Sequence, residues 1–140
     1  MDTSDRSAPL ARRRGPVLAV GNDGQGYDKE WIVCDNTLTS PYYGNCSIEV
    51  NVTSSGNRVI MSTSREGGAT WSTPASPSGT NSGLGNQPLV QPNGTVVVPF
   101  STNGSSIRSF TSTNGGTSWG SHRAGRQRLL ARRGRQPARR

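Results

Sequence analysis

Two carboxylates near the start of the chain have the spacing of a hydrolytic pair. Asp28 and Glu30 lie two residues apart in a stretch of β-forming residues. On a regular strand their side chains would share one face, with Cα atoms about 6.6 Å apart, and glycoside hydrolysis commonly uses two carboxyl groups at such a separation. The alternative, which the intervening Lys29 favours, is an exposed start of a strand without a catalytic role.

Two adjacent phenols are the next candidates. Tyr42 and Tyr43 stand in the sequence Pro-Tyr-Tyr-Gly and could supply a nucleophile or a stacking platform for a sugar ring. The alternative is packing within a turn, which the flanking proline and glycine favour because both are ordinary turn residues. We therefore assign neither tyrosine to a catalytic role.

The chain contains a single histidine, His122. A Ser-His-Asp triad or a histidine-rich metal site therefore lacks its parts. No glycine-rich loop runs into Lys-Ser or Lys-Thr, so nothing in the sequence supports nucleotide binding. We expect no metal and no cofactor.

Two cysteines, Cys34 and Cys46, flank an eleven-residue connection between two expected strands. Antiparallel pairing of those strands would bring the cysteines opposite one another. A disulfide there would stabilise the fold by about 3 kcal/mol on the chain-entropy model, and it would indicate an oxidising compartment. Two free buried thiols are the alternative.

The net charge of +8 belongs to the C-terminal end of the chain. Residues 121–140 contain eight arginines and no acidic residue, whereas the rest of the chain holds eight basic and eight acidic groups. An arginine-rich segment could bind nucleic-acid phosphates, but this one has no aromatic residue to stack on bases. We interpret it as a disordered tail and expect no nucleic-acid partner.

Residues 16–120 are predicted to form an all-β domain. Short β-forming runs alternate with clusters of Gly, Asn, Ser and Pro, which is typical of antiparallel strands joined by turns. No segment combines helical periodicity with caps, so helix should be nearly absent. The expected strands are Glu30–Cys34, Ser47–Thr53, Arg58–Thr63, Thr95–Phe100 and Ser106–Ser112.

The N-terminal segment and the apolar runs exclude further classes. Residues 1–15 are polar and basic, and we expect them to be a disordered leader. No apolar run approaches the length of about 18 residues that spans a bilayer, so no membrane partner is expected. The four apolar residues at 17–20 are too few for the core of a signal peptide.

Two stretches of the chain repeat one another at an offset of 48 residues. Residues 60–71 and residues 108–119 each run from a strand into Ser-x-(Glu/Asn)-Gly-Gly-x-(Thr/Ser)-Trp. A period of 40–50 residues with about four strands per unit is typical of the blades of a β-propeller.

The repeated residues predict a tight turn with its own hydrogen bonds. A short polar side chain at the third position can bond backbone N–H groups of the turn, and paired glycines adopt positive φ without steric cost. Asn114 suits that role, whereas the extra methylene of Glu66 carries its carboxylate too far out. The first turn should therefore be the weaker one.

These repeats resemble the Asp box, the bacterial neuraminidase repeat Ser-x-Asp-x-Gly-x-Thr-Trp of sialidases and sialidase-like β-propellers. Residues 28–35, 40–45 and 92–98 are also similar to blade sequences of this superfamily. The resemblance implies a sialidase-type β-propeller fragment of about two four-stranded antiparallel blades with disordered basic termini. Both Asp positions depart from the pattern. The structural turns would consist of Ser64, Glu66, Gly68, Thr70 and Trp71, and of Ser112, Asn114, Gly116, Ser118 and Trp119.

The resemblance also implies a chemistry. Active members of the family hydrolyse terminal sialic acids with a Tyr nucleophile assisted by Glu, an Asp acid/base and three arginines that hold the substrate carboxylate. The Phe/Tyr-Arg-Ile-Pro motif that supplies the first arginine is absent, and no such motif surrounds Arg58, Arg65 or Arg108. We therefore assign no catalytic residue, and we interpret Trp71 and Trp119 as packing residues of the turns.

Two functions remain as alternatives. The first is a fragment of a sialidase-like glycoside hydrolase of exo-α-sialidase lineage, which would act on sialoglycoconjugates when complete. We expect this chain alone to be inactive, because a propeller of four to eight blades needs roughly 200–400 residues. The second is a non-catalytic Asp-box module that binds glycans or protein partners. Uncovered blades would favour self-association, and the resemblance implies a secreted bacterial protein.

Overall fold

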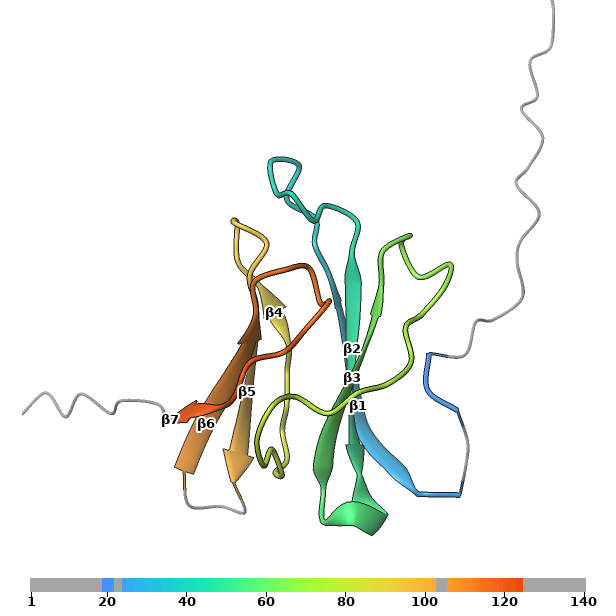
Figure 1. The fold of residues 1–140 in the computed structure, drawn as a ribbon, viewed down its shortest axis with the longest axis vertical. Helices are drawn as coiled ribbons and strands as arrows, with labels where there is room; N and C mark the ends of the chain where they lie inside the picture. The colour runs from blue at the N-terminus through green and yellow to red at the C-terminus, as the bar shows by residue number, and fades with distance from the viewer. Residues whose placement is uncertain (1–18, 22–23, 103–105, 125–140) are drawn as a thin grey trace, which may run out of the picture.

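The computed structural model describes residues 19–21, 24–102 and 106–124 (Figure 1). Seven strands in these ranges form two antiparallel sheets, one in the order β1-β2-β3 and one in the order β4-β5-β6-β7. One short 3₁₀ helix, Thr53–Ser55, is the only helix there. The predictions of an all-β antiparallel chain and of almost no helix are confirmed. The strands are β1 (Tyr27–Cys34), β2 (Cys46–Val52), β3 (Arg58–Ser64), β4 (Leu89–Val90), β5 (Val96–Thr102), β6 (Ser106–Ser112) and β7 (Arg123–Ala124).

The main hydrophobic core lies between the two sheets, which stand side by side (Figure 1). Strand β3 contributes Val59 and Met61. The rings of Phe110 and Trp119 meet edge to face with their centroids 5.8 Å apart, an arrangement that aromatic pairs favour. We call residues 64–71 the first box turn and residues 112–119 the second. The partners of Val59 and Met61 from the second sheet and the second box turn are Val96, Val98, Phe100, Phe110 and Trp119.

Strand β2 buries residues on both of its faces. Because successive side chains of a strand point to opposite faces, Val50 and Val52 lie on one face, in an apolar cluster with Ile60. The opposite face carries a polar row that is also buried, although polar residues usually mark the solvent side of a strand. This row consists of Ser47, Glu49 and Asn51.

The polar row of β2 faces the same space as the main core. Glu49 stands directly opposite Met61 of β3, and Asn51 stands directly opposite Val59. Directly opposed residues of antiparallel strands share a face. On this face, residues 83–86, which lead into β4, bond Glu49 and Asn51, and both side chains are buried.

The expectation of four strands in each sheet holds for the second sheet only. After β3 the chain returns beside that strand, but it makes isolated bridges, at Ala75 and Ser82, in place of a continuous ladder. Pro74 and Pro77 lie in this segment and lack the N–H that a ladder requires. The first sheet therefore has three strands and an interrupted fourth edge.

The two sheets differ in how much of their remaining face is covered. On the first sheet, Val20 and Tyr27 pack against the cluster around Val50. On the second sheet, Leu89 of β4 and Ile107 of β6 are 44% and 61% exposed. Leu89 and Ile107 thus leave an apolar surface open on the second sheet.

The β structure extends past residue 120, where we expected it to end. Strand β7 pairs with β6 within the range that we assigned to the tail. The expected leader at residues 1–15 and residues 125–140 of the tail lie outside the described residues. In the described ranges, no helix has the length and hydropathy needed to cross a membrane.

Candidate functional site

The two repeated motifs form the same turn. The Oγ of Ser64 accepts a hydrogen bond from the N–H of Gly68 at 2.8 Å, and the Oγ of Ser112 accepts one from the N–H of Gly116 at 2.9 Å. Gly68 and Gly116 have φ of 91° and 82°, a conformation that only glycine adopts readily. One serine hydroxyl and one left-handed glycine therefore close each turn.

The third motif position differs between the turns. The Oδ1 of Asn114 accepts the backbone N–H of Ser118 at 3.0 Å, and its Nδ2 donates to the Oγ of Ser118 at 2.8 Å. The longer Glu66 instead accepts the hydroxyl of Thr70, at 3.2 Å and exposed to solvent. The hydrogen bond from the side chain at the third motif position to the backbone is thus seen in the second turn. The lower stability of the first turn stays a prediction.

The second turn is also a contact between the sheets. The phenol of Tyr42, in the loop between β1 and β2, donates to the carbonyl oxygen of Thr113 at 3.1 Å. A Cβ on Gly115 would lie 2.5 Å from the ring of Tyr42, so this position lacks room for a side chain. The structure thus places Tyr42 in packing between the sheets, whereas Tyr43 is 57% exposed.

Trp71 and Trp119 occupy the same motif position but differ in burial. Trp119 is 8% exposed and belongs to the core, whereas Trp71 is half-buried and lines a groove of about 410 Å³ between the two turns. Arg65 lines the same groove, and its Nη2 donates to the Oγ1 of Thr117 at 2.5 Å. The guanidinium therefore links the first turn to the second.

The arginines of the β region do not converge. Arg58 begins β3 and Arg65 follows its end, so roughly 20 Å of strand separates their backbones. Arg108 lies on β6, and its Nη1 is 2.8 Å from the Nε2 of His122. Among the residues that the structure describes, Arg58, Arg65 and Arg108 form no three-arginine clamp for a carboxylate.

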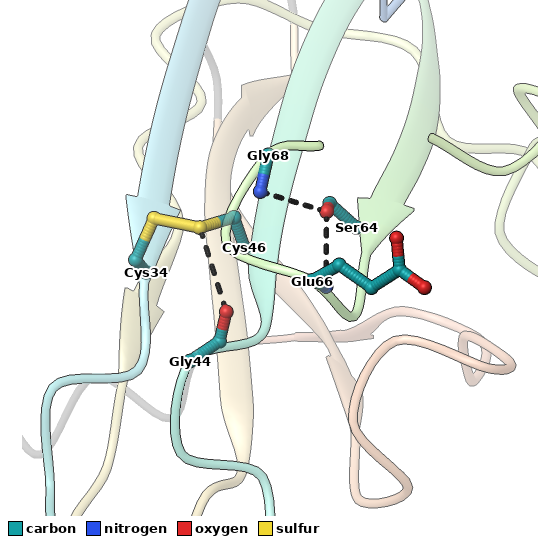
Figure 2. Close-up of a disulfide and its surroundings, with 6 residues drawn as sticks. All are labelled: Cys34, Gly44, Cys46, Ser64, Glu66 and Gly68. Carbon is teal, nitrogen blue, oxygen red and sulfur yellow. Dashed lines mark hydrogen bonds between the residues drawn. A yellow bond between two sulfur atoms is a disulfide. The ribbon is translucent and has the colours of Figure 1, made fainter. Parts of the chain in front are cut away.

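A disulfide joins Cys34 of β1 to Cys46 of β2 (Figure 2). The two residues are direct register partners, with Cα atoms 4.0 Å apart. Cys46 also pairs with Ser64 of β3, so the disulfide lies beside the first box turn, as Figure 2 shows. The Sγ of Cys46 lies 3.8 Å from the carbonyl oxygen of Gly44. This is a contact rather than a hydrogen bond, because a disulfide sulfur carries no hydrogen.

A pocket of about 460 Å³ opens between the first residues of β1 and the segment before β4. The pairing of β1 with β2 shifts register between Asp28 and Trp31, and Lys29 has a φ of 56°. The regular alternation that we assumed for Asp28 and Glu30 therefore does not hold; both residues instead line this pocket. The lining consists of Asp28, Lys29, Glu30, Trp31, Gly85, Asn86 and Gln87.

Asn86 connects this pocket to the buried polar row of β2. Its Nδ2 donates to the Oε1 of Glu49 at 2.5 Å and to the Oδ1 of Asn51 at 3.0 Å. The Nδ2 of Asn51 in turn donates to the carbonyl oxygen of Gly83 at 2.7 Å. A continuous set of amide and carboxyl bonds therefore ties β2 to residues 83–86.

Glu49 has the most perturbed acidity in the described part of the chain. Burial raises the pKa of its carboxyl from 4.5 to about 8, because an ionised carboxylate loses its hydration there. The hydrogen bond from Asn86 lowers this pKa in part, and the negative charge of Glu30 raises it further. The carboxyl is therefore mostly protonated at neutral pH and can donate a hydrogen bond.

Sequence reasoning missed both Glu49 and Asn86. In β2, apolar and polar residues alternate, a pattern that places the polar residues on the solvent side. Asn86 lies in a Gly- and Asn-rich segment, a composition that indicates an ordinary turn. The sequence offers no signal that these residues meet, because a segment more than 30 residues away in the chain covers this face of β2. Across the described ranges, no group of three or more His, Cys, Asp or Glu residues could hold a metal ion.

Comparisons of the chain with protein-family models, with curated proteins and with solved structures find no match.

Proposed function

We propose that the chain forms two blades of a sialidase-like Asp-box β-propeller. The observation that carries this proposal is the same turn after β3 and after β6, closed in each case by a serine hydroxyl and a left-handed glycine. Repeated units with equivalent strands and turns are what a blade repeat produces. Face-to-face packing of the two sheets is also what adjacent blades require.

We further propose that the chain belongs to an exo-α-sialidase lineage and does not hydrolyse sialosides by itself. Three features support inactivity. The arginines Arg58 and Arg65 stand at opposite ends of β3, and the phenol of Tyr42 donates to a backbone carbonyl. Among the residues that the structure describes, no arginine lines the pocket with the carboxylates Asp28 and Glu30. An arginine is the group that best binds a sugar carboxylate, through two parallel hydrogen bonds.

A fluorogenic sialoside, 4-methylumbelliferyl N-acetylneuraminic acid, tests this proposal. The purified full chain should release no more fluorophore than buffer does, whereas a known sialidase in the same buffer should release it readily. Tyr43→Phe is the matching control, because it removes the exposed phenol. Release that scales with the concentration of the chain would contradict inactivity, and its loss in Tyr43→Phe would assign the activity to that phenol.

A non-catalytic Asp-box module that binds glycans is the second candidate. The pocket beside β1 favours it, because an exposed tryptophan and several polar side chains meet there without a substrate-carboxylate clamp. Strands β1 and β4 lie at the edges of their sheets and contact one another. The pocket therefore opens where the two proposed blades approach each other.

A further inference from the structure

The pocket beside β1 combines an aromatic face with hydrogen-bonding groups. Trp31 is 51% exposed, although it pairs directly with the buried Glu49. Asn86 and Gln87 line the pocket from the segment before β4. An aromatic side chain beside a few polar groups is the usual composition of a small-ligand site.

Asn86 and Glu49 have hydrogen-bonding capacity that the described residues do not use. Asn86 is 3% exposed, and its Oδ1 has no hydrogen-bond partner among those residues, although its Nδ2 makes two bonds. The Oε2 of Glu49, which is fully buried, likewise has none. A buried polar atom without a partner is costly and uncommon. Asn86 lines the pocket whereas Glu49 does not, so a ligand group that donates to Asn86 would be favoured.

The charges of the pocket restrict what it can bind. Asp28 and Glu30 carry two negative charges against the single positive charge of Lys29. This excess of negative charge repels a ligand carboxylate. A hydroxyl group, which both donates and accepts, suits a wall of amides and carboxyls better than an ionised group does.

We propose that this pocket binds an uncharged hexopyranose ring at the end of a glycan. The ring stacks on Trp31, and its hydroxyl groups bond Asn86 and Gln87. This inference deepens the glycan-binding candidate above and rests on it, whereas it does not depend on the sialidase lineage.

Saturation-transfer NMR on the full chain tests the ligand class. The neutral probes are the methyl glycosides of galactose, glucose and mannose; the methyl glycoside of N-acetylneuraminic acid is the anionic probe and galactosamine the cationic one. At least one neutral glycoside should show saturable transfer and bind at least tenfold more tightly than both charged probes. Absence of saturable transfer from every neutral glycoside would overturn the proposal, and so would tighter binding of either charged probe.

Two variants locate the binding site. Trp31→Ala and Gln87→Ala should each weaken binding of the neutral glycoside at least tenfold. Tyr43→Ala should not change its affinity, because Tyr43 is a similarly exposed aromatic residue outside the pocket. Amide NMR spectra report whether each variant folds. Gln87→Ala removes only an exposed side chain, so it decides the outcome where Trp31→Ala unfolds. Equal losses in Tyr43→Ala and the pocket variants would place the ligand elsewhere and overturn the proposal.

The two proposals fail in distinguishable ways. Hydrolysis of the fluorogenic sialoside by the chain contradicts inactivity and leaves the neutral-sugar site unaffected. Failure of every neutral glycoside to bind removes the neutral-sugar site and leaves the proposed blade structure unaffected.

Discussion

The raised pKa of Glu49 results from the face of β2 on which the residue lies. A glutamate among Ile48 and Val50 would be a solvent-facing residue in a sheet covered on one side only. Here the segment before β4 lies on that face, and Glu49 is fully buried. Its one amide partner, Asn86, offsets only part of the lost hydration, so the neutral carboxyl is the favoured form.

We expect the chain to lose stability as the pH rises from about 5 to about 8. The pKa of Glu49 is about 8 in the folded chain against an ordinary value of 4.5, so the folded state binds this proton more tightly than the unfolded state does. The stabilisation is complete below pH 4.5 and is lost as the pH rises through 8. Its rate of loss is at most about 1.4 kcal/mol per pH unit. Urea denaturation at successive pH values measures it.

Glu49→Gln separates this effect from other titrations. Glutamine has a similar shape and does not titrate, so the variant should show a flatter dependence of the unfolding free energy on pH. The control Glu66→Gln alters an exposed carboxylate and should keep the slope of the parent. An unchanged slope in Glu49→Gln would assign the pH dependence to another group.

The two box turns show how one local structure can serve two roles. Both turns close through the same serine and glycine bonds. The second also packs against the loop between β1 and β2, where Asn45 donates to the carbonyl oxygen of Gly115 at 3.0 Å. Both turns therefore take part in joining the sheets, the first through Arg65 and the second also through the loop between β1 and β2.

Gly115→Ala should destabilise the chain more than the matched change Gly67→Ala. Both glycines hold the same motif position with φ of 63° and 60°, so alanine is similarly strained at each. A Cβ at Gly115 would meet Tyr42 at 2.5 Å and Asn45 at 2.7 Å, whereas nothing lies within 4 Å of a Cβ at Gly67. We expect a loss of about 1 kcal/mol for Gly67→Ala and about 2–4 kcal/mol for Gly115→Ala. Equal losses of unfolding free energy in urea denaturation would mean that the loop holding Tyr42 moves to make room for the added methyl group at no cost in free energy.

The disulfide in the first sheet occupies the position at which the second sheet has an apolar pair. Cys34 opposes Cys46, and Val90 opposes Val96. The two pairs are equivalent because Cys46 and Val96 each stand opposite the serine that closes the following turn. A valine pair therefore fits this position in the second sheet without a covalent bond.

Removing the disulfide should cost about 3 kcal/mol, because twelve positions separate the cysteines along the chain and the free loop gains entropy when unfolded. The double variant Cys34→Val/Cys46→Val should be more stable than Cys34→Ala/Cys46→Ala by about 1 kcal/mol or more, since it keeps more apolar volume. Urea denaturation with and without reductant measures both effects. If the urea midpoint of unfolding of the parent chain is the same with and without reductant, the disulfide does not stabilise the fold.

The whole molecule is asymmetric, because its two sheets differ in how much of their apolar surface is covered. The side chains of Val50 and Val52 are covered on the first sheet. On the second sheet, Leu89 stands directly opposite the half-buried Val97 and Ile107 is exposed. A further blade would cover such a face in a propeller, because each blade packs against its neighbours.

We therefore expect the isolated chain to self-associate through this face. Its sedimentation coefficient should rise with concentration, and Ile107→Lys should reduce that rise because it places a charge on the apolar face. Leu38→Lys is the matched control, since Leu38 is 81% exposed in the loop between β1 and β2. Equal behaviour of the two variants would place the association elsewhere, and a concentration-independent coefficient in the parent would contradict self-association.

The strand boundaries show which elements local patterns predict. The expected strand Ser106–Ser112 has the same bounds as β6, and the expected strand Arg58–Thr63 is one residue shorter than β3. The sequence did not indicate β4 and β7, because two residues are too few to show an alternating pattern. The interrupted fourth edge of the first sheet follows from prolines that the sequence contains, whereas the resemblance implied a four-stranded blade.

The sequence by itself determined the five longer strands, the repeated turns and the opposition of the two cysteines. Each depends on residues close together in the chain: a turn serine and its glycine are four residues apart, and the cysteines face each other across one hairpin. Only the tertiary structure decided the buried polar row, the different burial of Trp71 and Trp119, and the pocket beside β1. Glu49 and Asn86 are 37 residues apart, and their contact exists because the segment that leads into the second sheet lies on one particular face of β2. A strand's own alternation cannot specify which of its faces a distant sheet will cover.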